Sequence, residues 1–92
     1  MITESVWVFN APKANFSSGV FRSPDEAEPW IAKFRLTGVL TEYPVGTGVL
    51  DWTMAMGYFT PKPEKLSDPE FVGRFSSASM KHIHYRDGVR AG

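Results

Sequence analysis

The chain contains two histidines, and they lie two positions apart at His82 and His84. Alternate side chains of a β-strand project from one face, so both imidazoles would point the same way, like paired metal ligands on single strands of some β-barrel enzymes. A catalytic metal normally needs a third protein ligand, and the spacing of the acidic residues places none beside the pair. A polar, solvent-facing strand surface of His82, His84 and Arg86 explains the same spacing. We favour the polar surface and keep a metal site at the two histidines as an alternative.

Hydroxyl and cationic side chains gather around the histidines. Three serines within residues 76–79 lie between Arg74 and Lys81, and Tyr85 and Arg86 follow. Hydroxyls and cations of this kind bind phosphate groups, and an aromatic ring can stack on a base. Phosphate loops usually add a glycine-rich turn at a helix N-terminus, and no such turn accompanies these residues. A solvated loop is the favoured interpretation, and a nucleic-acid or phosphate site at Arg74, Lys81, Tyr85 and Arg86 stays open.

Aromatic residues are abundant, since three Trp, three Tyr and seven Phe make up 14% of the chain. Periodicity assigns four of these rings to the core, namely Trp7, Phe21, Trp30 and Phe34. Trp52, Tyr58 and Phe59 lie on or just after a segment that is apolar around most of its circumference. A small domain has few buried positions for three more rings, so these are either core residues or an exposed protein-binding patch. Trp52, Tyr58 and Phe59 are the interface candidate.

Length and charge limit what the chain can be. Its 92 residues suit one domain, which we expect to span residues 1–92, with an ordered part from about 5 to 88 and a flexible tail at 89–92. Ten basic and ten acidic residues give a net charge of zero, so no general attraction to nucleic acid or to an anionic membrane is expected. Cysteine is absent, and neither a secretory leader nor a long apolar run is evident, which favours the cytoplasm.

Four strands are predicted. Residues 6–9 are apolar on both faces, which is typical of an interior strand covered on two sides, and residues 16–22 are the expected hairpin partner. Residues 39–43 form the third strand, because β-branched and aromatic residues there precede a proline. Residues 81–86 alternate between polar and apolar types, which predicts a half-exposed strand that ends at Asp87 and Gly88.

The clearest local signal is the start of the first helix. Ser23 is followed by a proline and, three positions later, by Glu26, which together form a capping-box pattern. Apolar residues then recur at helical spacing through residues 27–34, and Gly38 is the expected C-terminal cap. Pro29 lies inside this helix and removes one backbone hydrogen bond, so a bend is expected there.

Two further helical segments are predicted. Thr47 is the expected cap of a helix over residues 48–56, with Gly57 just past its end. A third, short segment starts at residues 68–70 and continues to about Phe75. The predicted fold class is therefore α+β, with a mainly antiparallel sheet of about four strands, two main helices packed on it and a short third helical segment.

Short sequence blocks follow one another in a fixed order from Val6 to Gly88. They are Val6–Phe9, Ser18–Phe21, Trp30–Lys33, Leu36–Pro44, Asp51–Trp52, Gly57–Phe59, Pro69–Phe71, Arg74–Ser79, His82, His84–Tyr85 and Asp87–Gly88. In this order the blocks resemble a family of small bacterial proteins classed as a domain of unknown function. The resemblance implies no activity, ligand or catalytic residue, because the family has none established.

Three hypotheses of function follow, each from a different class. The leading one is a small non-enzymatic interaction or regulatory module, similar to an immunity protein or antitoxin, that binds a protein partner and needs no cofactor. The second is a nucleic-acid or phosphate-binding domain, which the zero net charge disfavours. The third is a metal-dependent enzyme at His82 and His84. Self-association into a homo-oligomer is compatible with the first hypothesis.

Overall fold

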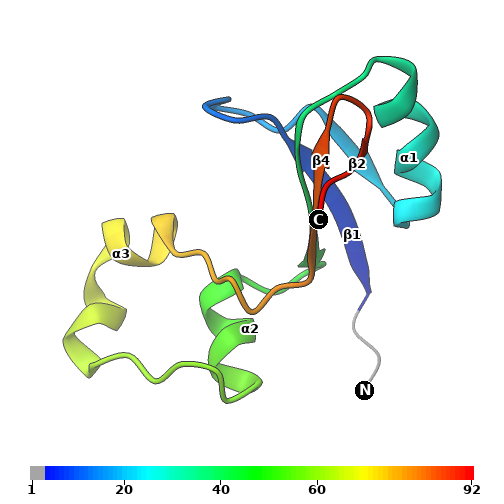
Figure 1. The fold of residues 1–92 in the computed structure, drawn as a ribbon. Helices are drawn as coiled ribbons and strands as arrows, with labels where there is room; N and C mark the ends of the chain where they lie inside the picture. The colour runs from blue at the N-terminus through cyan, green and yellow to red at the C-terminus, as the bar shows by residue number, and fades with distance from the viewer. Residues whose placement is uncertain (1–3) are drawn as a thin grey trace. The chain divides into compact units, whose positions relative to one another are not determined.

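The computed structural model describes residues 4–92, which fall into two compact units. One unit contains the chain up to Val45 together with Met80–Gly92, and the other contains Gly46–Ser79 (Figure 1). The prediction of a single domain stays a prediction, because two compact units can still unfold as one cooperative domain.

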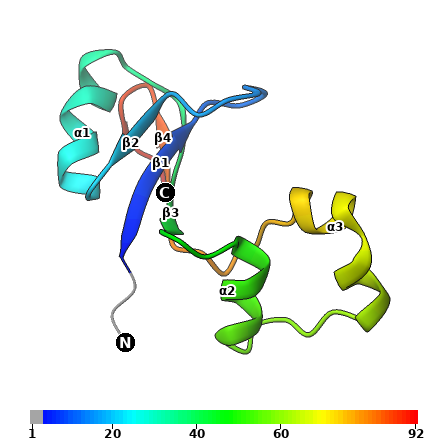
Figure 2. The same ribbon diagram turned by 180° about the vertical axis from the view of Figure 1, so that it is seen from behind.

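The first unit is an antiparallel sheet with one α-helix on one of its sides (Figure 2). Over residues 4–92 the sheet has five strands in the order β2-β1-β3-β4-β5. The strands are β1 (Ser5–Asn10), β2 (Gly19–Phe21), β3 (Gly38–Pro44), β4 (His82–Arg86) and β5 (Val89–Arg90), and the helix is α1 (Pro24–Lys33).

The interior position predicted for the first strand is confirmed, because β1 pairs with β2 on one side and β3 on the other. Its hairpin partner is shorter than predicted, and Phe16 lies outside β2 with 84% of its surface exposed. Burial of β1 is less complete than predicted, since Phe9 is buried and the other residues of the strand are half-buried. Antiparallel sheets can leave one face to solvent, and on the face away from α1 the β4 residues His82, His84 and Arg86 are exposed.

α1 starts as the capping pattern predicts. The Ser23 side chain accepts a hydrogen bond from the Glu26 backbone N–H at 3.2 Å. The Glu26 carboxylate in turn accepts from the backbone N–H of Arg22 at 2.9 Å, one residue earlier than in a standard capping box. The helix continues through Pro29 without interruption.

The end of α1 differs from the prediction, which placed the cap at Gly38. The helix ends at Lys33, and Arg35 adopts the left-handed conformation with a φ of 53°. The Leu36 N–H donates to the Ile31 carbonyl and the Arg35 N–H to the Ala32 carbonyl, which is the hydrogen-bond pattern of a Schellman motif. Gly38 instead belongs to β3, where a Cβ atom would lie 2.7 Å from the Phe9 ring.

The core of the first unit lies between α1 and the sheet. Its fully buried members are Phe9, Ala27, Ile31, Leu40 and Tyr85. Burying each of the larger side chains contributes roughly 1.5–3 kcal/mol, so this cluster is the main source of stability in the unit. Trp7, Phe21 and Trp30 pack against it as predicted, whereas Phe34 is 55% exposed because it follows the last turn of the helix.

The last strand was not predicted. Residues 89–92 were expected to form a flexible tail, whereas Val89 and Arg90 pair with Arg86 and Tyr85. Asp87 and Gly88 have φ angles of 50° and 90°, and two positive φ angles are the requirement of a type I′ hairpin turn. The strand predicted over residues 81–86 is therefore the first arm of a hairpin.

One hydrogen-bonded cluster joins α1 to this hairpin. The Tyr85 hydroxyl donates to Glu28 Oε2 at 2.6 Å, and Arg90 Nε donates to the same oxygen at 2.5 Å. The bond from Tyr85, followed by the one from Arg90, lowers the pKa of the Glu28 carboxyl below its usual value. Burial, together with the Glu28 carboxylate, raises the pKa of Tyr85 to about 12.

The second unit contains α2 (Val49–Ala55), the 3₁₀ helix η1 (Pro63–Ser67) and α3 (Pro69–Arg74). Within residues 4–92 the chain therefore has three α-helices and five antiparallel strands, which confirms the α+β class. None of the helices in this range combines the length and apolar character that crossing a membrane requires.

The Tyr85–Glu28 bond predicts a loss of stability in alkali. A tyrosine whose folded pKa is raised from 10 to about 12 stabilises the fold below pH 10, and this contribution disappears as the pH rises toward 12. Tyr85→Phe should cost about 1–2 kcal/mol at pH 7 and flatten the alkaline decrease in melting temperature. Thermal unfolding monitored by circular dichroism between pH 7 and 11.5 tests both effects. Tyr58→Phe is the control, since that ring is 53% exposed, and an unchanged slope in Tyr85→Phe would contradict the assignment.

The left-handed conformation of Arg35 predicts a stabilising substitution. Arg35→Gly should raise the free energy of unfolding by about 0.5–1 kcal/mol, because glycine adopts a positive φ without a Cβ clash. Urea unfolding measures the change. Arg35→Ala keeps the Cβ atom and should show no gain, so equal stabilisation by both variants would mean that strain at Arg35 is not the cause.

Candidate functional site

The three candidate interface residues belong to the second unit, where α2 positions Trp52. The N-cap of α2 is Gly48, and no side chain caps this end, so the prediction of Thr47 as the cap is wrong. The extended conformation that an N-cap residue adopts occurs one position later than predicted. Inside the helix, the buried Thr53 hydroxyl donates to the Val49 carbonyl at 2.7 Å.

The turn after α2 brings Tyr58 back to the helix. Gly57, predicted as the residue past the end, has a φ of 77°. The Tyr58 N–H donates to the Thr53 carbonyl and the Gly57 N–H to the Met54 carbonyl, which again is a Schellman motif. The Trp52 and Tyr58 rings meet edge to face with their centroids 5.7 Å apart.

Phe59 belongs to a second aromatic group. Its ring stacks on Phe75 with centroids 5.4 Å apart, and the Phe71 ring centroid lies 5.7 Å from that of Phe75. α3 starts where the sequence predicts, because the Asp68 carboxylate accepts hydrogen bonds from the backbone N–H groups of Glu70 and Phe71. We call Trp52, Tyr58, Phe59, Phe71 and Phe75 the aromatic surface of the second unit.

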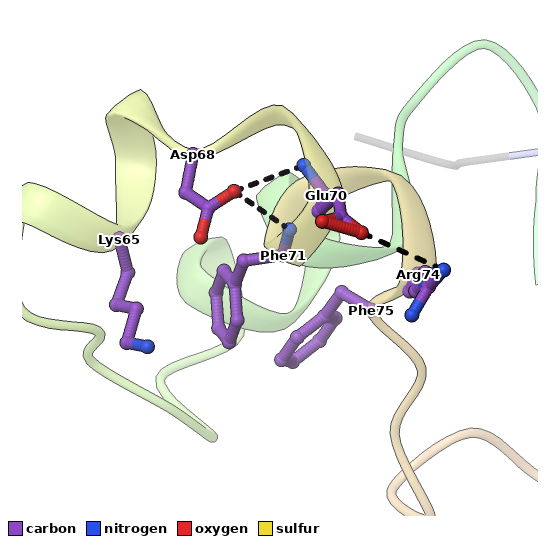
Figure 3. Close-up of a pocket in the computed structure, with 6 residues that line it drawn as sticks. All are labelled: Lys65, Asp68, Glu70, Phe71, Arg74 and Phe75. Carbon is purple, nitrogen blue, oxygen red and sulfur yellow. Dashed lines mark hydrogen bonds and ion pairs between the residues drawn. The ribbon is translucent and has the colours of Figure 1, made fainter.

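An open pocket of about 400 Å³ lies beside α3 (Figure 3). Phe71 and Phe75 form its apolar part, and the Lys65 ammonium lies 5.4 Å from the centre of the Phe71 ring. Asp68 caps the helix, and Glu70 forms an exposed ion pair with Arg74 at 3.5 Å. The pocket therefore combines an apolar floor with charged side chains of both signs at its rim.

The side chains of the three candidate interface residues differ in how much of their surface is exposed. Tyr58 is 53% exposed and Phe59 is 39% exposed, whereas Trp52 is half-buried. The side chains of Tyr58 and Phe59 are therefore accessible at the surface, and Trp52 contacts Tyr58 edge to face.

The residues of the phosphate or nucleic-acid alternative do not form one site. Tyr85 is only 3% exposed and its hydroxyl is bonded to Glu28, so its ring cannot stack on a base, and this part of the prediction is wrong. Arg86 is exposed and follows Tyr85 on a strand, so it projects from the opposite face. Lys81 is exposed in the first unit, and Arg74 belongs to the second unit, where it pairs with Glu70.

The two histidines lie as the strand period predicts. His82 and His84 are both exposed on β4, and their ring centroids are 5.3 Å apart. His82 Nδ1 lies 2.8 Å from the Met80 carbonyl oxygen. Among residues 4–92 no third histidine, cysteine or carboxylate joins them in a metal-binding group.

Phe71 and Phe75 are the members of the aromatic surface that sequence reasoning missed. Their spacing of four residues indicated a helix, and in the structure Phe71 lies in α3 while Phe75 is the C-cap residue that follows it. The contact of Phe75 with Phe59 depends on the path of residues 60–68, for which the sequence carries no periodic signal. The four-residue spacing of Phe71 and Phe75, together with a Phe59 that had no place in the predicted core, is the signal that could have extended the candidate site.

Comparison with known proteins identifies a family. No curated protein and no solved structure is significantly similar to the chain. A family model described as a domain of unknown function, DUF7710, matches residues 6–91, and this description points to no enzymatic activity. The match contains every candidate site residue and nearly the whole of both units. The chain therefore belongs to the DUF7710 family, and the resemblance inferred from its sequence blocks to a domain of unknown function is confirmed.

Proposed function

We propose that the protein is a non-enzymatic interaction module that binds another protein through the aromatic surface of the second unit. Tyr58 and Phe59 make the contact, Phe71 and Phe75 extend it along α3, and Trp52 holds Tyr58 in position. The proposal continues the leading hypothesis from the sequence and adds the α3 residues to it.

One observation carries the proposal: the second unit exposes far more large apolar side chains than it buries. Of residues 46–79, Leu50 and Thr53 are buried. The large apolar residues exposed in the same range are Met56, Tyr58, Phe59, Leu66 and Val72. Exposed apolar residues that are concentrated in one small unit mark surfaces that become covered when a partner binds.

Charge favours a protein partner over nucleic acid. The net charge of the chain is zero, and the one basic candidate in the second unit, Arg74, is paired with Glu70. Nucleic-acid surfaces need several cations that face the phosphates together, whereas protein interfaces combine an apolar centre with a mixed polar rim. The pocket beside α3, with Lys65 and Arg74 against Asp68 and Glu70, has the second composition.

Within this function we assign a regulatory role of the immunity or antitoxin type, in the cytoplasm of a bacterium. The small size and the absence of cysteine, which is usual in reducing compartments, support this role. A second copy of the chain is included among the partners, because an apolar surface of this kind also serves homo-oligomers.

The proposal predicts that one exposed pair of rings controls partner binding. The protein is immobilised and exposed to an extract of the cells that produce it, at low and at high salt. The wild type should retain a stoichiometric protein at both salt concentrations, because apolar contacts are not screened. The Tyr58→Ser, Phe59→Ser double variant should lose it, with at least a tenfold drop in affinity of the isolated partner.

Phe16→Ser is the matched control, since it removes an even more exposed ring from the first unit. It should keep full binding, and circular dichroism confirms that both variants fold. Equal loss in both variants, or the absence of any retained protein, would reject the proposal. Nucleic acid that is recovered at low salt and lost at high salt would instead support the second hypothesis.

A further inference from the structure

β4 presents its two sides to different surroundings. Ile83 and Tyr85 face α1 and the core, so His82 and His84 share the opposite, exposed face of the sheet. On this face the neighbouring residues of β3 are Thr41, which lies opposite His82, and Val39, which lies opposite His84. Neither Thr41 nor Val39 is charged, so a salt bridge to β3 does not explain why two histidines occupy these positions.

The two rings converge. Alternate residues of an antiparallel strand are about 6.8 Å apart along the chain, yet the ring centroids are separated by 5.3 Å. With metal–nitrogen bonds of about 2.0–2.1 Å and a tetrahedral angle, the centroids of two coordinated imidazoles lie about 5 Å apart. The observed separation of the two ring centroids is therefore close to that of a metal-bound pair.

A backbone contact sets the tautomer of one ring. The Met80 carbonyl oxygen only accepts hydrogen bonds, so His82 Nδ1 at 2.8 Å is the donor. In the neutral ring the lone pair then resides on Nε2, which points away from that carbonyl. A histidine that donates through one nitrogen to a carbonyl and binds metal through the other is the usual arrangement in metal sites.

The surroundings define which cation the pair suits. Imidazole nitrogens prefer Zn²⁺, Cu²⁺ and Ni²⁺, whereas Mg²⁺ and Ca²⁺ need oxygen ligands, and among residues 4–92 no carboxylate joins the two histidines. Both rings are exposed, so water can fill the remaining coordination positions. Arg86 lies two residues beyond His84 on the same face, and its positive charge weakens the binding of a cation there.

From these observations we infer that His82 and His84 form a two-imidazole chelate for a transition-metal dication of the zinc class, with water in the open positions. This site is separate from the aromatic surface and does not depend on the proposed protein interaction. It also differs from a metal-dependent active centre, because it needs neither a third protein ligand nor a reaction.

Titration of tag-free protein with Zn²⁺ alone tests the inference, since the chain contains no other histidine and no cysteine. Calorimetry should give one Zn²⁺ per chain, and the ring signals of His82 and His84 should shift together in NMR spectra. His82→Gln and His84→Gln each leave one imidazole and should bind at least tenfold more weakly, because the second ligand of a chelate binds at high effective concentration.

Arg86→Gln is the control variant, because it substitutes a residue on the same face of β4 and removes a positive charge there. It keeps both imidazoles and should bind Zn²⁺ at least as tightly as the wild type. The inference is overturned if wild type and His84→Gln bind Zn²⁺ with equal affinity, or if the ring signal of only one histidine responds. Far-UV circular dichroism of each exposed-site variant verifies that a weaker affinity is not caused by unfolding.

Discussion

Pairing between β3 and β4 is the constraint on which the rest of the structure depends. Leu40 lies opposite Ile83 and Thr41 opposite His82, and the Glu42 N–H donates to the Lys81 carbonyl at 2.9 Å. This pairing closes the chain around residues 46–79, and a loop of that length costs roughly 3 kcal/mol in entropy. Burial of Leu40 and Tyr85 under α1 offsets the cost, so the core of the first unit holds the two ends of the second unit's chain together.

Strand alternation lets β4 serve two purposes at once. Its core-facing Tyr85 reaches Glu28 on α1, and this carboxylate also receives Arg90 from the hairpin that β4 and β5 form. The alternate residues of β4, His82 and His84, lie together on the opposite face of the sheet. A shift of one residue in the pairing with β3 would bury the imidazoles and expose Tyr85, so the core contact also maintains the histidine pair.

The second unit is stabilised differently from the first. Local interactions set one end of each α-helix, namely the Asp68 cap at the start of α3 and the left-handed Gly57 after α2. Such interactions contribute about 1 kcal/mol each and set where a helix starts and stops, without supplying a core. With Leu50 and Thr53 as the buried residues of this range, the rings of Tyr58 and Phe59 stay at the surface, which is the physical basis of the proposed interaction.

Features that depend on neighbours within a few residues were determined by the sequence alone. Ser23 and Asp68 start helices because their side chains accept bonds from amides two or three positions away, and the period of β4 places both histidines on one face. Tertiary structure decided what involves distant residues. The Tyr85–Glu28 bond joins residues 57 positions apart in the chain, and Arg90 reaches the same carboxylate from 62 positions away. The left-handed Arg35 and the Asp87–Gly88 turn rest on local hydrogen bonds, but glycine is the residue that such a helix end usually has, and residues 89–90 carry no strand signal of their own. A local pattern reports hydrogen bonds within one turn of chain, whereas the bonds to Glu28 exist only after α1 has packed on the sheet.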